Sequence, residues 1–63
     1  MNSIEVYRKK MKLSQSELAN LLGVTQSAVA KWETGESRPR ANKLPELARI
    51  FKCSIDALFN DTE

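Results

Sequence analysis

The sequence predicts a single all-α domain, a compact bundle of short helices. Two glycines and two prolines among 63 residues supply little turn material for β-hairpins. Apolar residues recur three and four positions apart in successive segments, which is the spacing of one face of a helix. Because a typical domain has roughly 100–200 residues, residues 1–63 are expected to form one domain.

Composition narrows the class of protein further. Hydrophobic residues make up 41% of the chain and charged residues 29%, as in globular rather than disordered proteins. There is no His, and the single Cys cannot form an internal disulfide. We therefore expect no metal, no cofactor and a reducing, cytoplasmic setting. Without a long apolar run or a secretory signal, we expect no membrane contact.

The first helix is predicted near the N-terminus. Positions i, i+3, i+4 and i+7 of one helix face are occupied by Ile4, Tyr7, Arg8 and Met11. Either Asn2 or Ser3 is suited to cap this helix. Tyr7 shares a face with Ile4, so we interpret its ring as part of the scaffold.

The second helix begins at a capping box. Ser14 is followed three residues later by Glu17, so the Ser14 hydroxyl caps the helix while the Glu17 carboxylate reaches back. Gly23 ends the helix, because glycine tolerates the left-handed conformation common at helix C-termini. The predicted apolar stripe consists of Leu18, Leu21 and Leu22, with Ala19 beside them.

The third helix is predicted over residues 26–33, with Thr25 as its N-cap and Gly35 after its end. At about 100° per residue, one flank is apolar and carries Ala28, Val29 and Trp32. The opposite flank is small or polar and carries Gln26, Ser27, Ala30 and Lys31. We interpret Trp32 as core support rather than as a platform for a stacked base.

Two further helices complete the predicted bundle. A basic-tilted loop, residues 36–40, leads to Asn42, which is expected to cap the fourth helix with Pro45 in its first turn. The apolar face of the fourth helix consists of Leu44, Leu47, Ala48 and Phe51. Ser54 caps a short last helix whose inward side chains are Ile55, Leu58 and Phe59. Residues 60–63 are expected to form a frayed tail or a linker.

The side chains offer little for catalysis. Without His there is no proton-transfer group near neutral pH, and the chain has no Gly-rich phosphate loop and no Ser–His or Cys–His pairing. Acidic residues are scattered rather than paired, and Cys53 is expected to be a small buried hydrophobe instead of a reactive thiol. We therefore predict that the protein is not an enzyme.

The informative unit is residues 14–35, which form a helix, a three-residue turn and a second helix. Small polar residues at the start of the second helix are what a helix entering the DNA major groove requires. Gln26 can present its amide to adenine, and Lys31 can donate to guanine. Gln15, in the first turn of the preceding helix, is suited to bind phosphate. From the residues alone, a protein-docking face is the alternative.

The string LSQSELANLLGVTQSAVAKWETG resembles the helix-turn-helix domain of the phage-repressor/Cro family, the XRE-like regulators. The resemblance continues through RPRANKLPELARIF and SIDALF, so it covers nearly the whole chain. Its specific features are Gln15, the Leu18-Ala19 pair, the Gly23-Val24-Thr25 turn, and the sequence Trp32-Glu33-Thr34-Gly35 at the end of the third helix. The resemblance implies a five-helix, lambda-repressor-like fold that binds double-stranded DNA as a transcriptional regulator, with repression the expected activity.

The resemblance also implies roles for individual residues. Base edges are contacted at the positions of Gln26, Ser27 and Lys31. Phosphates are contacted at the positions of Gln15, Thr34, Arg38, Arg40 and Lys43, and Gln15 also buttresses the first base contact. Arg8 and Glu33 match a structural salt bridge that ties the first helix to the recognition helix. Lys12 and Lys52 stand where relatives often have Gly, so a left-handed conformation there would cost on the order of 1 kcal/mol each.

One recognition helix covers few base pairs, so useful specificity implies a homodimer on a two-fold operator with half-sites about one turn apart. The family often dimerises through its C-terminal helix, which points to Ile55 and Leu58, although ordinary core packing explains both equally well. No small-molecule ligand is inferred. A rival hypothesis keeps the fold but makes the domain an adaptor or antitoxin that acts mainly through protein–protein contacts.

Overall fold

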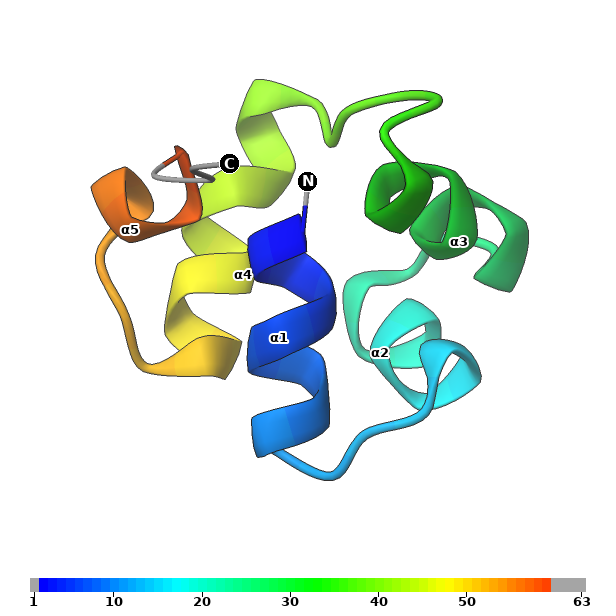
Figure 1. Ribbon diagram of the computed structural model, residues 1–63, viewed down its shortest axis with the longest axis horizontal. Helices are drawn as coiled ribbons and strands as arrows, with labels where there is room; N and C mark the ends of the chain where they lie inside the picture. The colour runs from blue at the N-terminus through cyan, green and yellow to red at the C-terminus, as the bar shows by residue number, and fades with distance from the viewer. Residues whose placement is uncertain (1, 60–63) are drawn as a thin grey trace.

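Five α-helices and one short 3-10 helix make up the structure. The computed structural model describes residues 2–59, and Figure 1 shows the helices packed around a common centre. In chain order the elements are α1 (Asn2–Lys10), α2 (Gln15–Leu22), α3 (Gln26–Thr34), η1 (Ala41–Lys43), α4 (Leu44–Phe51) and α5 (Ile55–Phe59). Residues 2–59 contain no strand, so the predicted all-α, five-helix fold is confirmed. The predicted tail, residues 60–63, lies outside the described residues.

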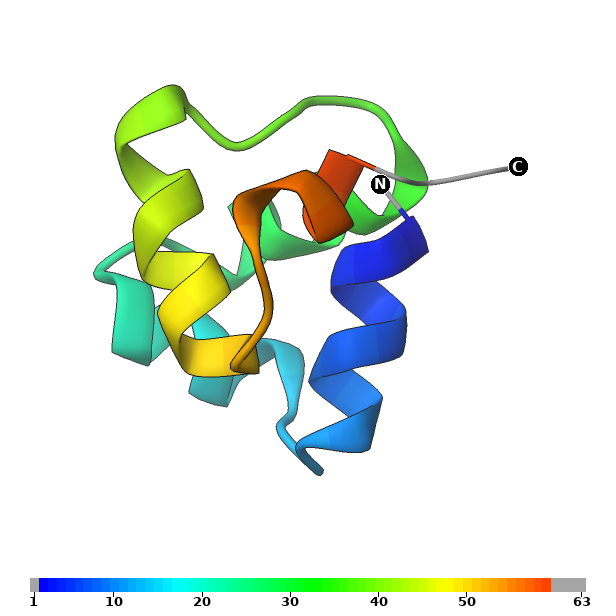
Figure 2. The ribbon, with the colours of Figure 1, turned by 90° about the vertical axis from the view of Figure 1, so that its left-hand side faces the viewer.

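Helix α1 lies between two pairs of helices. Figure 1 shows α2 and α3 on one side of α1, and α4 and α5 on the other. The view in Figure 2 shows α5 between α4 and α1, and α5 packs against both of these helices. Helix α3 therefore stands at the edge of the molecule away from α5. In the part of the chain that the structure describes, every helix is too short or too polar to cross a lipid bilayer.

The ends of α2 and α3 are fixed by the residues that the sequence indicates. The Ser14 hydroxyl accepts a hydrogen bond from the Glu17 backbone N–H at 3.0 Å, and the Glu17 carboxylate accepts one from the Ser14 N–H at 2.7 Å. The Thr25 hydroxyl accepts from the Ala28 N–H at 3.1 Å. Between these caps, Gly23 has a φ of 71°, which lets the chain leave α2 and enter α3 within three residues. Residues 15–34 thus contain two helices joined by a three-residue turn.

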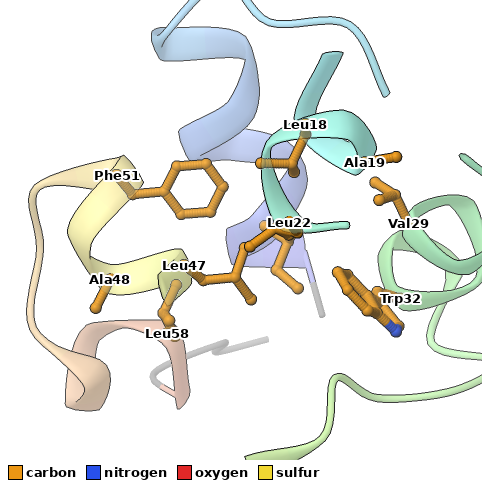
Figure 3. Close-up of a cluster of buried hydrophobic side chains, with 10 residues drawn as sticks. Leu18, Ala19, Leu22, Val29, Trp32, Leu47, Ala48, Phe51 and Leu58 are labelled. Carbon is orange, nitrogen blue, oxygen red and sulfur yellow. The ribbon is translucent and has the colours of Figure 1, made fainter. Parts of the chain in front are cut away.

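The core draws apolar side chains from all five helices. Figure 3 shows this cluster, in which Leu18 of α2, Leu47 of α4 and Leu58 of α5 meet. The buried hydrophobic residues are Ile4, Leu18, Ala19, Leu22, Val29, Trp32, Leu47, Ala48, Phe51 and Leu58. The Tyr7 ring stacks on the Phe51 ring with centroids 5.5 Å apart. Trp32 and Tyr7 are therefore scaffold, as predicted.

Three residues predicted for apolar or inward helix faces are exposed instead, and the third is Ile55, at 39%. The side chain of Phe59, also predicted to face inward, lies outside the described part of the structure. Leu21 is 59% exposed and Met11 is 38% exposed. On α2 the buried side is centred between Leu18, Ala19 and Leu22, so Leu21 lies about 105° away from it at ~100° per residue. Helix α1 ends at Lys10, so Met11 follows the helix and no longer continues its face.

Two predicted caps are also wrong. Helix α1 already includes Asn2 and Ser3, and the Ser3 hydroxyl donates to the Leu58 carbonyl at 2.8 Å, tying α1 to α5. Asn42 lies inside η1, and α4 begins at Leu44 without a side-chain cap. The preceding 3-10 turn leads directly into α4, while Pro45 occupies the first turn as predicted. Ser54 does cap α5, because its hydroxyl accepts from the Ala57 N–H at 3.1 Å.

Two lysines have a left-handed backbone. Lys12, after α1, has a φ of 58°, and Lys52, after α4, has a φ of 55°. Both follow the C-terminus of a helix, where glycine adopts this conformation without the steric conflict between Cβ and backbone. Both lysines therefore have the left-handed conformation expected at positions where relatives often have glycine.

Candidate nucleic-acid interface

Helix α3 has a buried side and an exposed polar side. Val29 is fully buried and Trp32 is 5% exposed, so this side is held in the core. Gln26, Ser27 and Lys31 are exposed on the other side and are called the polar face below. The first turn of α3 has only polar or small side chains outside the core. A second macromolecule can therefore approach the N-terminal half of α3 closely.

The first turn of α2 contacts the first turn of α3 through side chains. The Gln26 Nε2 donates to the Gln15 Oε1 at 2.9 Å. The Gln15 Nε2 in turn donates to the Glu33 Oε1 at 3.0 Å. Gln15 is half-buried, whereas Gln26 is exposed. The two amides are thereby held side by side at one edge of the polar face.

A buried ion pair joins α1 to the end of α3. The Arg8 Nε lies 2.6 Å from the Glu33 Oε2, and the Arg8 Nη2 donates to the Glu33 Oε1 at 3.2 Å. The Arg8 Nη1 donates to the Leu13 carbonyl at 2.8 Å. The two side chains are 11% and 5% exposed, and the hydrogen bond with Glu33 raises the pKa of Arg8 despite the opposing effect of burial. Because a buried charge left unpaired costs about 3–5 kcal/mol, this pair fixes the position of α3.

The loop after α3 presents cations beside that helix. Arg38 and Arg40 are exposed, while Pro39 between them is buried and anchors the loop. Thr34 is the last residue of α3, and its hydroxyl donates to the Lys31 carbonyl at 3.1 Å. Lys43 is directed inward, because its Nζ donates to the Leu22 carbonyl at 2.8 Å and closes the end of α2. Lys43 is predicted to bind phosphate, and it also has a structural contact with the end of α2.

A depression of about 380 Å³ lies between the turn after α2, helix α3 and the basic loop. Its apolar wall is formed by Val24, Ala28 and Trp32. Its polar lining consists of Ser37, Arg38, Arg40, Asn42 and Lys43. Three of these lining residues are cations, although the Lys43 Nζ also lies 3.8 Å from the Glu46 carboxylate. Sequence reasoning did not anticipate Ser37 and Asn42 here, although both belong to the same polar segment as the basic residues.

The C-terminal helix places its two predicted dimer residues differently. Leu58 is fully buried, so a second chain cannot contact it without opening the core. Ile55 is 39% exposed and is the residue of the two that a second chain could reach. The alternative interpretation of Leu58 as ordinary core agrees with the structure. Of the two predicted dimer residues, Ile55 is therefore the one available for a contact.

The sequence profile of the helix-turn-helix family matches residues 4–58. This match spans every helix described above. The chain belongs to the helix-turn-helix family. Within this helix-turn-helix domain, the matched residues include α2 and α3 in full. The recognised resemblance is thus confirmed, and the family comprises regulators rather than enzymes, as predicted.

Three curated relatives of the domain are regulators from a phage and from bacteria. Repressor protein C2 of Salmonella phage P22 is 36% identical over 55 residues, which are 87% of this chain and 26% of the relative. The HTH-type transcriptional regulator DicA of Escherichia coli strain K12 is 35% identical over 61 residues, 95% of this chain and 45% of the relative. The HTH-type transcriptional activator BcrR of Enterococcus faecalis is 32% identical over 60 residues, 95% of this chain and 29% of the relative. The helix-turn-helix domain thus spans less than half the length of these relatives. No solved structure matches the chain significantly.

Chemically reactive groups are scarce in the described part of this helix-turn-helix domain. Within residues 2–59, no three His, Cys, Asp or Glu residues are grouped so that they could hold a metal ion. Cys53 is half-buried and packs against the core. Burial raises the pKa of its thiol, which disfavours the nucleophilic thiolate. The structure therefore directs attention to the polar face and the basic loop.

Proposed function

We propose that this helix-turn-helix domain binds double-stranded DNA in a sequence-specific manner and regulates transcription in the cytoplasm, as a repressor. The observation that carries the proposal is the two-sided nature of α3. Val29 and Trp32 hold one side in the core, and the polar face is left exposed at the edge of the molecule. A helix is about 10–12 Å across, and the major groove is about 12 Å wide, so this face fits the groove.

Base recognition is assigned to the polar face. An exposed glutamine amide pairs with both Hoogsteen-edge groups of adenine, which suits Gln26. The Lys31 ammonium lies on the same face and suits the guanine acceptors O6 and N7. Ser27 has a shorter side chain, so its contact with a base runs through water or is weak. Gln26 and Lys31 therefore carry most of the proposed specificity.

Phosphate contacts are assigned to the surfaces on both sides of the polar face. On one side, Gln15 has a second amide N–H that its bond to Glu33 leaves available at the N-terminus of α2. On the other, Arg38 and Arg40 line the depression beside α3, with Thr34 close in sequence. Lys43 has further N–H donors beyond the one bound to Leu22. These contacts would fix the register of α3 without selecting a sequence.

Selection of preferred duplexes from a random pool tests the proposal, followed by affinity measurements at several salt concentrations. We expect a defined preferred sequence and an affinity that falls with salt as counterions are released. Lys31→Ala should relax the preference at one base pair, whereas Arg40→Ala should weaken binding to all sequences alike. A domain without any sequence preference, or variants that abolish binding to a protein but leave DNA affinity unchanged, would contradict the proposal and favour an adaptor.

We further propose that the domain acts as a homodimer on a two-fold operator. A single α3 reads few base pairs, and two copies related by a two-fold axis double the site. Ile55 is the exposed apolar residue on α5 that can contribute to such a contact. The selected duplexes should then contain inverted half-sites about one helical turn apart. Ile55→Asp should reduce cooperative binding to the full site while leaving affinity for one half-site unchanged.

A further inference from the structure

Three hydrogen bonds connect the polar face to the buried ion pair. They run from Gln26 to Gln15 at 2.9 Å, from Gln15 to Glu33 at 3.0 Å, and from Arg8 to Glu33 at 2.6 Å. These side chains come from three helices, Arg8 from α1, Gln15 from α2, and Gln26 and Glu33 from opposite ends of α3. The residue that faces solvent is thus linked, through one intermediate amide, to a carboxylate that is 5% exposed.

The chemistry of Glu33 fixes the direction of every bond in this series. A carboxylate paired with a guanidinium has acceptors only, whereas an amide has an acceptor at one end and two donors at the other. Gln15 must therefore direct its Nε2 to Glu33, as observed. Its Oε1 is then left to face Gln26, so Gln26 must direct its own Nε2 inward, as observed. Reversing either amide would place oxygen against oxygen.

This direction leaves Gln26 with a defined set of outward groups. One of its two Nε2 hydrogens is bound to Gln15, so one N–H and the Oε1 acceptor are available. In the major groove, adenine presents an acceptor at N7 and a donor at N6, which match these two groups. Guanine presents two acceptors, N7 and O6, and its O6 would face the Gln26 Oε1.

Glu33 is itself held firmly. Both carboxylate oxygens accept from Arg8, and Arg8 is further held by the Leu13 carbonyl at 2.8 Å. No buried side-chain nitrogen or oxygen within the described residues lacks a hydrogen-bond partner, so the Glu33 carboxylate is fully satisfied in this position. The carboxylate is thus held in place and determines the orientation of the two amides.

We propose that Glu33, which does not reach the DNA, is a specificity-determining residue that makes Gln26 select adenine over guanine by fixing the direction of the Gln26–Gln15–Glu33 hydrogen bonds. The inference rests on the proposed function, which assigns adenine to Gln26, and adds the residue that enforces this preference. Arg8 is a positioning residue in this scheme, because it holds the carboxylate but does not set its acceptor character.

The test compares duplexes that differ only at the base pair read by Gln26, which is located as the position whose preference disappears in Gln26→Ala. Wild-type protein should prefer adenine there. Glu33→Gln supplies an amide that can donate to Gln15, so the series can reverse and turn both Gln26 N–H groups outward. The adenine-to-guanine affinity ratio should then fall about tenfold, the order of discrimination that one bidentate base contact gives.

Arg8→Lys is the matched control, since it weakens the ion pair but keeps the Glu33 carboxylate. It should lower affinity for both duplexes by the same factor and preserve the ratio. An unchanged ratio in folded Glu33→Gln overturns the inference. Should that variant not fold, Gln15→Met decides, because it removes the intermediate amide at similar length from a half-buried position. An unchanged ratio in Gln15→Met also overturns the inference, and a reduced one supports the part of it that runs through Gln15.

The outcome separates this inference from the proposed function. Wild-type protein without any sequence preference contradicts DNA recognition by α3 as a whole. Wild-type protein that prefers adenine opposite Gln26, with an adenine-to-guanine ratio that Glu33→Gln leaves unchanged, contradicts only the role given to Glu33.

Discussion

At the scale of single residues, the backbone of Lys52 limits the stability of the domain. Its φ of 55° places Cβ close to the neighbouring backbone, although its N–H still closes the end of α4 by bonding to the Ala48 and Arg49 carbonyls. Lys52→Gly should raise the free energy of unfolding by about 1 kcal/mol, because glycine adopts this conformation without steric conflict. Chemical denaturation followed by circular dichroism measures the change.

A glycine inside the same helix provides the control for this prediction. Arg49→Gly also removes a long exposed side chain, but at a position with helical backbone. It should lower the free energy of unfolding by about 1 kcal/mol, since glycine is a poor helix former. Lys12→Gly should behave like Lys52→Gly, because Lys12 has a φ of 58°. Destabilisation by both lysine replacements would show that their left-handed backbone is not under strain.

The Cys53 thiol makes the stability of the domain depend on pH. Burial raises the pKa of the thiol, and a hydrogen bond with Tyr7 opposes this in part. The folded protein therefore keeps the thiol proton at a pH where the unfolded chain loses it. Stability from this group is complete below the ordinary thiol pKa of 9.0 and is lost as the pH rises through the folded pKa. Cys53→Ala should accordingly destabilise the domain less at pH 10 than at pH 7, and an equal loss at both would contradict the prediction.

At the scale of elements, the start of α3 depends on one side chain. The Thr25 hydroxyl accepts from the Ala28 N–H at 3.1 Å, and Gln26 and Ser27 lie in the turn that this bond closes. Thr25→Ala should lower the free energy of unfolding by about 1 kcal/mol, the usual cost of removing an N-cap. Thermal denaturation measures it, with Ser16→Ala on the exposed side of α2 as a control that should change stability by less than about 0.5 kcal/mol. Equal effects would argue against the capping role.

Local patterns were sufficient to predict most helix ends, because caps act over three or four residues. The predicted helix ends are formed by Ser14 with Glu17, Thr25, Gly23, Gly35 and Ser54. Local patterns failed where contacts with residues distant in sequence determine the structure. Leu21 is exposed because Ala19 of α2 faces the core instead. The packing of α2 against α3 determines this orientation. Asn42 is no cap because η1 runs directly into α4.

The same distinction applies to the candidate site. Periodicity alone identified the exposed side of α3, because Gln26 and Lys31 lie opposite Val29 and Trp32 on one helix. The bond from Gln15 to Glu33 joins residues that are 18 apart in sequence, so only the crossing of α2 and α3 brings them together. The inward direction of Lys43 toward the Leu22 carbonyl likewise depends on tertiary packing and has no local signal.

At the scale of the whole molecule, the positions of the charged residues are more informative than the net charge. The net charge is only +2, from ten basic and eight acidic residues. Several of these charges are neutralised in place, since Arg8 pairs with Glu33 and Lys9 pairs with Glu5 at 2.9 Å. Arg38 and Arg40 have no ion pair of this kind within the described residues and line the depression beside α3. These two arginines therefore place positive charge without a carboxylate partner directly beside the polar face.

This arrangement predicts which charges control the salt dependence of DNA binding. Each neutralised phosphate releases counterions, so the slope of log affinity against log salt concentration changes by about 1 when one cation–phosphate pair is removed. Arg38→Ala and Arg40→Ala should each reduce the slope by about 1, without changing which sequence is preferred. Arg49→Ala on α4, which lies across α1 from α3 in Figure 1, should leave the slope unchanged. If all three variants lowered the slope equally, net charge rather than its position beside α3 would govern binding, and the basic loop would no longer have its assigned role.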